Sequence, residues 1–110
     1  MNTFFRVTQK DKNEIISFLQ NNSQIKKEEC ENFFKLQSFC SDNKQNASYG
    51  WCIRDKEKKV RGFLGAITHY NLYYKKKVVN MTNWVVCKKY RSLSLGLLKK
   101  FIKNNSYIYI

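Results

Sequence analysis

The chain contains no proline, four glycines and one histidine among its 110 residues. With so little proline and glycine, long flexible linkers are not expected, which favours a single compact domain. No apolar run approaches the roughly 18 residues that a membrane-spanning helix needs. The N-terminus MNTFFRVTQKDK lacks the basic leader, apolar stretch and cleavage site of a signal peptide. A cytoplasmic location without membrane attachment is therefore expected.

Closely spaced metal ligands are also scarce. Cys30, Cys40, Cys52 and Cys87 form no CxxC pair, and His69 is the only histidine. Structural zinc sites normally take four Cys or His ligands from closely spaced pairs. No metal site is expected, and the thiols are predicted to be reduced and mostly buried.

Acidic residues are few, with 8 Asp and Glu against 21 Lys and Arg, which gives a formal net charge of +13. A strong positive field attracts nucleic acid, anionic lipid or a phosphorylated ligand. The excess is lysine rather than arginine, however, and such lysine-rich usage also arises from compositional drift. Both interpretations stay open. The chain is 43% hydrophobic and 15% aromatic, which is enough for a packed core.

Hydrophobic periodicity predicts one α/β (α+β) domain over residues 1–110, with the element order β-α-α-β-β-β-α-β. Asp11 is expected to cap the first helix, and Glu14 stands at capping-box spacing. The last helix is long enough to join two parallel strands. The expected strands are 3–8, 47–54, 60–74, 78–87 and one beginning near 106, and the expected helices run from 11 to about 21, from 26 to 39 and from about 91 to 104. Because the last strand reaches the final residue, the polypeptide is expected to be cut short.

The segment that is most informative about function is residues 84–101, WVVCKKYRSLSLGLLKKF. A strand ends there, the chain turns tightly, and an amphipathic helix begins. The first N–H groups of a helix lack partners inside the helix and lie at the positive end of its dipole, so they bind anions. Ser92, Ser94 and Gly96 are small enough for a phosphate to reach the backbone, and Arg91 adds charged donors. The pattern predicts an anion site at residues 91–96.

At this segment the chain resembles the GNAT acyltransferases. Arg91-Ser-Leu-Ser-Leu-Gly96 is similar to their Arg/Gln-x-x-Gly-x-Gly/Ala signature, and residues 86–91 are similar to their lead-in Val-x-Pro-x-Tyr-Arg. Ser94 and Lys88 replace the usual Gly and Pro, which indicates a divergent member. Residues 49–53 and 61–65 resemble the second and third strands of that family. The resemblance covers nearly the whole chain and implies a mixed, mostly antiparallel sheet flanked by helices, truncated after the fifth strand begins.

The resemblance implies an acyl-CoA-dependent N-acyltransferase that uses acetyl-CoA or another acyl-CoA and an amine-bearing acceptor. The pyrophosphate would lie at residues 91–96, and the pantetheine arm would pair with the backbone of residues 84–86 between the fourth and fifth strands. The side chains of Trp84 and Val86 are also expected in the core. The implied cofactor-binding residues are Trp84, Val85, Val86, Arg91, Ser92, Leu93, Ser94, Leu95 and Gly96.

The catalytic acid and base stay unassigned. Residues 78–87 contain no Asp or Glu, and the Tyr that this family often carries after the fifth strand has no counterpart. Asn80 and Asn83 are the only catalytic candidates, since they could polarise a carbonyl, while His69 and Cys87 have ordinary structural explanations.

Two rival hypotheses remain. The first is a basic nucleic-acid-binding module, which the charge and the aromatic residues support. The second is an inactive relative that binds CoA or a partner, which the missing catalytic residues support. The exposed edges of the sheet would also allow a dimer. The acceptor and the acyl chain length cannot be read from the sequence.

Overall fold

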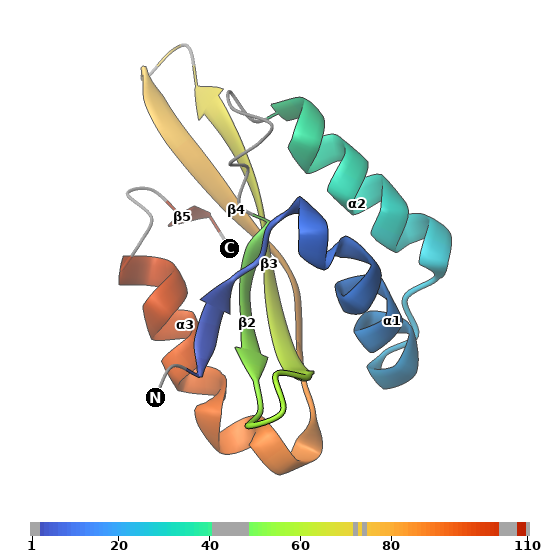
Figure 1. Cartoon of the computed structure of the whole chain (residues 1–110). Helices are drawn as coiled ribbons and strands as arrows, with labels where there is room; N and C mark the ends of the chain where they lie inside the picture. Colours follow the sequence, from blue (N-terminus) through green and yellow to red (C-terminus); the bar gives the residue numbers. More distant parts are fainter. Residues whose placement is uncertain (1–2, 41–48, 72, 74, 104–107, 110) are drawn as a thin grey trace.

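The computed structural model describes residues 3–40, 49–71, 73, 75–103 and 108–109, which form a five-stranded sheet with helices on both faces (Figure 1). The strands lie in the order of the sequence. The first four pair antiparallel, and the fifth pairs parallel with the fourth. The strands are β1 (Phe4–Arg6), β2 (Gly50–Arg54), β3 (Val60–Asn71), β4 (Lys76–Val86) and β5 (Ile108–Tyr109). The predicted fold class and element order are confirmed.

The helices divide between the two faces of the sheet (Figure 1). On one face lie the 3₁₀ helix η1 (Gln9–Asp11), α1 (Lys12–Asn22) and α2 (Lys27–Cys40). On the other lies α3 (Ser94–Lys103), preceded by the 3₁₀ helix η3 (Lys88–Leu93). None of the helices in the described ranges has the length and apolar character needed to cross a membrane. Residues 41–48, which include the start of the strand predicted at 47–54, lie outside the described residues.

Each face of the sheet has its own hydrophobic core. Side chains alternate between the faces along β3, so Phe63 packs beneath α1 and α2 while Leu64 packs beneath α3. The buried residues of α1 and α2 include Ile15, Leu19 and Phe34, and those of α3 are Leu97 and Phe101. Most of the apolar side chains whose spacing predicts the helices therefore pack against the sheet, whereas Leu36 and Ile102 are exposed.

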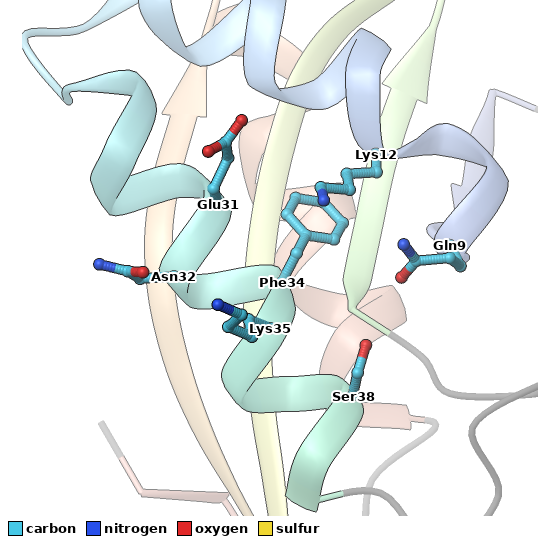
Figure 2. A pocket seen from close by; sticks show the side chains of 7 residues that line it. All are labelled: Gln9, Lys12, Glu31, Asn32, Phe34, Lys35 and Ser38. Carbon is cyan, nitrogen blue, oxygen red and sulfur yellow. The ribbon is translucent and has the colours of Figure 1, made fainter.

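Tyr49 joins α2 to the start of α1. Its buried ring packs on Phe34 with centroids 4.7 Å apart, and its hydroxyl donates to Gln9 Oε1 at 2.7 Å. The same hydroxyl forms a hydrogen bond with Ser38. Gln9 and Ser38 also line an open cavity of about 470 Å³ between the start of α1 and the outer side of α2 (Figure 2).

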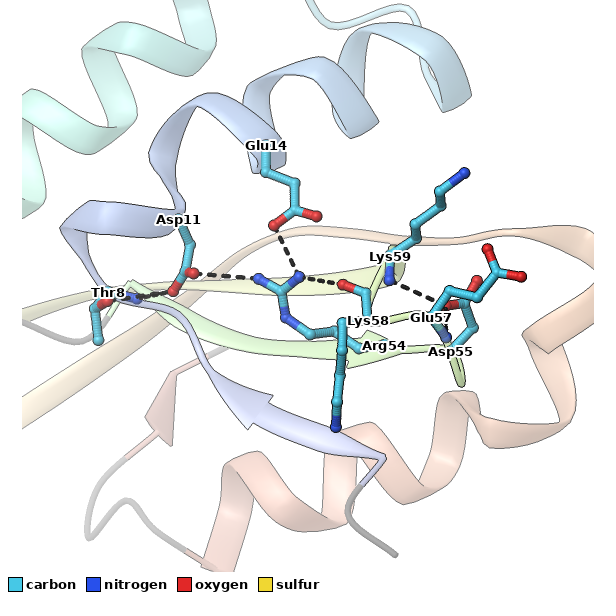
Figure 3. A network of polar contacts seen from close by, with 8 residues as sticks. All are labelled: Thr8, Asp11, Glu14, Arg54, Asp55, Glu57, Lys58 and Lys59. Atoms are coloured by element: carbon cyan, nitrogen blue, oxygen red, sulfur yellow. Dashed lines mark hydrogen bonds and ion pairs between the residues drawn. The ribbon is translucent and has the colours of Figure 1, made fainter.

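The start of α1 differs from the prediction. Asp11 is the N-cap residue, but its side chain makes no capping hydrogen bond. Its Oδ2 instead accepts from the N–H of Thr8 at 2.8 Å, and Arg54 pairs with Asp11 Oδ1 at 3.1 Å and with Glu14 Oε1 at 2.8 Å (Figure 3). The predicted Asp11–Glu14 capping box is wrong, because η1 begins the helical segment one turn earlier and Arg54 attracts both carboxylates.

Gly50 should not tolerate a side chain. Its φ is +122°, and a Cβ added there would lie 2.1 Å from the carbonyl oxygen of Leu64 in the neighbouring strand. We expect Gly50→Ala to reduce the free energy of unfolding by about 3 kcal/mol or more, because backbone strain and a backbone clash combine. Urea denaturation measures the change. Gly62→Ala is the control, since its added Cβ meets the movable Cδ1 of Ile53 at 2.8 Å. Equal losses for the two variants would contradict the expectation.

The cysteines should differ in reactivity. Burial raises the pKa of the Cys52 thiol to about 12, and Cys30 is also buried, whereas Cys87 is half-buried. Only the thiolate reacts with alkylating reagents. Iodoacetamide at pH 8 should therefore modify Cys87 well before Cys30 and Cys52, as followed by peptide mass spectrometry. Rapid modification of Cys52 in the folded protein would show that the core under α1 and α2 is accessible to the reagent. The side chain of Cys40 lies outside the described part of the chain.

Candidate functional site

A β-bulge interrupts β4 near its end. Ala66 pairs with Met81 and Leu64 with Trp84, so Gly65 alone faces two residues of β4, Thr82 and Asn83. Two residues opposite one define a β-bulge, which bends the strand and redirects the side chains that follow. A Cβ at Gly65 would lie 2.2 Å from Thr82 Oγ1. A side chain at position 65 would therefore require the side chain of Thr82 to move.

The bulge reverses the alternation of side chains along β4. Val79 and Met81 pack on the α3 face before it, and Val86 packs on the same face after it. Val85 and Cys87 consequently face α1 and α2. Without the extra residue, the end of β4 would present the opposite set of side chains to each core.

Beyond the bulge, the outer edge of β4 is unpaired within the described ranges. β5 pairs with β4 only at Val79 and Asn80. An unpaired strand edge offers a row of N–H and C=O groups to an extended ligand. Residues 84–86, predicted to pair with the pantetheine arm, lie along this edge.

The chain turns from β4 into α3 through hydrogen-bonded 3₁₀ turns. The N–H of Cys87 donates to the carbonyl of Arg61 at 2.8 Å, and the N–H of Tyr90 donates to that of Cys87 at 2.8 Å. The N–H of Ser94 then bonds to the carbonyl of Arg91, and α3 begins at Ser94. The prediction that residues 91–96 open a helix after a strand is confirmed. Residues 88–90, predicted as a short connection, are already helical.

The end of β4 and the start of α3 meet at an open cavity of about 370 Å³. Five of its lining residues are among those predicted to bind the cofactor, and the other two come from the end of α1. The lining residues are Asn22, Ser23, Trp84, Val85, Val86, Arg91 and Ser94. The backbone thus joins two halves of the predicted site in one cavity.

The other four predicted residues lie around this cavity rather than in its lining. Ser92 and Leu95 are exposed, and Leu93 lines a separate cleft beside the β2–β3 hairpin. Gly96 faces β1, because a Cβ there would lie 2.8 Å from Cζ of Phe4. This glycine has a packing reason of its own, since it lets α3 approach the sheet.

Trp84 was expected in the core, and that expectation is wrong. Its side chain is 42% exposed, and it lines the open cavity at the end of β4. Val86 is half-buried and packs with the α3 core, as expected.

Sequence reasoning missed Asn22 and Ser23. The sequence indicates only that a helix ends at these residues, and no motif marks them as part of a site. Cys87 Sγ donates to Asn22 Oδ1 at 3.4 Å, which connects the end of α1 to the end of β4. The Ser23 hydroxyl donates to the carbonyl of Leu19 at 2.5 Å and so closes the last turn of α1.

The catalytic candidates do not reach the cavity lining. Asn80 is half-buried between its partners Ile67 and Tyr109, and Asn83 is half-buried in the bulge. No carboxylate lines the cavity among the described residues. The side chain of His69 lies outside the described part of the structure. No cluster of three or more potential metal ligands occurs in the described ranges.

Thr82 carries a polar atom that is buried without a partner in the described structure, its Oγ1. A buried hydroxyl without a hydrogen bond costs about 1–3 kcal/mol. Thr82→Val keeps the shape and removes the hydroxyl, so we expect the free energy of unfolding to rise by about 1 kcal/mol in urea denaturation. Thr82→Ser is the control, which keeps the hydroxyl and loses the methyl group. A Val variant less stable than the unchanged protein would mean that the hydroxyl has a stabilising partner.

Comparison with known proteins supports the fold. No family model matches the chain, and neither does any curated protein sequence. Among solved structures, an acetyltransferase of Trypanosoma brucei aligns with a TM-score of 0.63 at 11% identity, over 96% of this chain and 79% of that one. An aminoglycoside 6′-N-acetyltransferase of Acinetobacter baumannii gives 0.62 at 8% identity, over 96% and 75%. A GNAT acetyltransferase of Staphylococcus aureus gives 0.60 at 20% identity, over 91% and 63%. The chain therefore has the fold of the GNAT N-acyltransferases, in a form of divergent sequence.

Proposed function

We propose that the chain binds acyl-CoA in the cavity at the end of β4 and transfers the acyl group to an amine. The observation that carries this proposal is the meeting of an unpaired strand edge, Trp84–Val86, with a helix start that carries Arg91 and Ser94. The acetyltransferases of similar fold support it.

The helix start is suited to the pyrophosphate. The N-terminal N–H groups of α3 and the dipole of its 10 residues attract an anion. Arg91 lines the cavity and is exposed, so its guanidinium can form charge-assisted hydrogen bonds with phosphate oxygens. Ser94 lines it too, and its hydroxyl adds a donor where the family signature has glycine.

The unpaired edge of β4 is suited to the pantetheine arm. That arm contains two amide groups, which can pair with the backbone of residues 84–86 as an added strand would. The thioester would then lie near Asn83 and Trp84, at the bulge. Backbone N–H groups freed from regular pairing in a bulge can stabilise the charge that develops on the carbonyl oxygen.

In the proposed reaction, the acceptor amine attacks the thioester carbonyl, and CoA leaves as the thiolate. The chain contributes positioning of the two reactants and hydrogen-bond donors to the oxyanion. An amine must lose its proton before or during the attack, and no carboxylate in the described cavity can accept it. This last observation favours a second candidate, a protein that binds CoA without turnover.

Isothermal titration with acetyl-CoA and free CoA tests the proposal. Arg91→Ala should weaken binding of both ligands by about tenfold or more, because one charge-assisted contact contributes about 1.5–3 kcal/mol. Ser94→Glu should weaken it further by placing a negative charge at the helix start. Lys99→Ala, which removes an exposed charge farther along α3, should leave the affinity within about twofold.

The outcomes separate the hypotheses. Saturable binding that depends on Arg91, followed by transfer to an amine, supports the acyltransferase. The same binding without transfer to any amine supports the inactive CoA-binding relative. A folded protein that binds neither ligand would refute the proposal.

A further inference from the structure

A second cleft, of about 520 Å³, lies between the β2–β3 hairpin and η3. Five of its lining side chains are cationic and two are acidic, with Thr3, Tyr90 and Leu93 completing the wall. The cationic residues are Arg54, Lys56, Lys58, Arg61 and Lys89, and the acidic ones are Asp55 and Glu57.

The 3₁₀ helix η3 separates this cleft from the cavity at the end of β4. A 3₁₀ helix turns about 120° per residue, so residues two apart point in different directions. Lys89 lines the hairpin cleft, whereas Arg91 lines the other cavity. One short helix therefore presents cations to two adjacent sites.

Several charged side chains of the cleft already form ion pairs or hydrogen bonds within the protein. Arg61 and the N–H of Lys59 hydrogen-bond to Asp55, at 2.8 and 3.0 Å, and hold the pKa of its carboxyl below the usual value. Arg54 pairs with Asp11 and Glu14 (Figure 3). Lys56, Lys58 and Lys89 form no ion pair within the described structure. The cleft therefore has three ammonium groups without an ion pair and only one such carboxylate, that of Glu57.

Local contacts position two of these lysines, Lys58 in the hairpin and Lys89 in η3. Lys58 has a φ of 69°, a left-handed conformation that non-glycine residues rarely adopt. Its carbonyl accepts from Arg54 Nη1 at 2.6 Å (Figure 3). Its N–H donates to the carbonyl of Asp55 at 3.0 Å. The Nζ atoms of Lys58 and Lys89 lie 5.0 and 6.0 Å from the ring centroids of Phe5 and Tyr90. These cation–π contacts orient the ammonium groups before any ligand arrives.

The acidic residues of the chain are confined to about its first half, so the remainder of the chain is strongly basic. All 8 acidic residues lie within residues 1–57, and no Asp or Glu follows Glu57. The elements that begin at the hairpin, β3, β4, η3 and α3, therefore carry cations without compensation from their own sequence. Such an asymmetry between the halves of a chain favours an anionic ligand.

We propose that the hairpin cleft binds a phosphomonoester through Lys56, Lys58 and Lys89. A phosphomonoester dianion matches three unpaired ammonium groups held around an open cleft, and Tyr90 and Leu93 offer an apolar wall to the group that carries the phosphate. Two sources supply this chemistry. One is the 3′-phosphate of the CoA molecule in the adjacent cavity, a possibility that rests on the proposed function. The other is a separate phosphorylated molecule.

Calorimetry with matched ligands distinguishes the sources. CoA, 3′-dephospho-CoA and inorganic phosphate are titrated into the unchanged protein and into Lys58→Asn/Lys89→Gln. Asn tolerates the left-handed conformation, and thermal melting checks the fold of each variant. The control is Lys99→Gln/Lys103→Gln, which removes two exposed charges of α3 outside the cleft.

If the 3′-phosphate occupies the cleft, the unchanged protein binds CoA about tenfold more tightly than dephospho-CoA at low salt. The cleft variant then loses this preference, keeps its affinity for dephospho-CoA, and the control retains the preference. If CoA and dephospho-CoA bind equally but inorganic phosphate binds in a manner that depends on Lys58 and Lys89, the ligand is a separate phosphorylated molecule.

Two results would overturn parts of the account separately. Binding of CoA with no preference over dephospho-CoA, and no phosphate binding that depends on the two lysines, would refute the cleft and leave the proposed function standing. A folded protein that binds neither form of CoA would refute the proposed function, while the phosphate titration would still decide the cleft.

Discussion

The β-bulge in which Gly65 faces both Thr82 and Asn83 sets the orientation of the last part of β4. Because one extra residue reverses the side-chain alternation, Val85 reaches the core under α1 and α2, and Val86 reaches the core under α3. The bulge also begins two residues after Asn80, the last residue of β4 that pairs with β5. The unpaired strand edge, the turn at Cys87 and the cavity beside Arg91 all lie beyond the bulge.

Much of this arrangement could be predicted from the sequence. The spacing of Leu93, Leu97 and Phe101 predicts α3, because it places these side chains on one face, and all three pack in the core under α3. The alternation of Tyr49, Trp51 and Ile53 predicts β2, although Tyr49 packs under α1 and α2 whereas Trp51 and Ile53 pack under α3. The strand–turn–helix order at residues 84–96 likewise depends on local signals, so its prediction did not require the tertiary structure.

The features that the sequence could not predict depend on contacts between distant residues. Asn22 and Ser23 line the cavity because α1 ends beside β4, which is a consequence of packing. The exposed Trp84 comes directly after a bulge whose partner, Gly65, lies in another strand. The capping box expected from the spacing of Asp11 and Glu14 does not form for the same reason. Arg54, which lies 40 or more residues away in the sequence, forms ion pairs with both carboxylates. Contact with a cofactor stays a prediction for all nine residues, Trp84, Val85, Val86, Arg91, Ser92, Leu93, Ser94, Leu95 and Gly96.

The most direct test of the central claim is an NMR titration of the ¹⁵N-labelled protein with CoA. If the ligand occupies the cavity at the end of β4, the backbone amides of residues 84–86 and 91–96 shift, and so does the indole N–H of Trp84. The indole of Trp51, which packs in the core with Lys100 5.2 Å from its ring, should move far less. Shifts confined to residues around the cavity of Gln9 and Ser38, or no shifts at saturating CoA, would contradict the account.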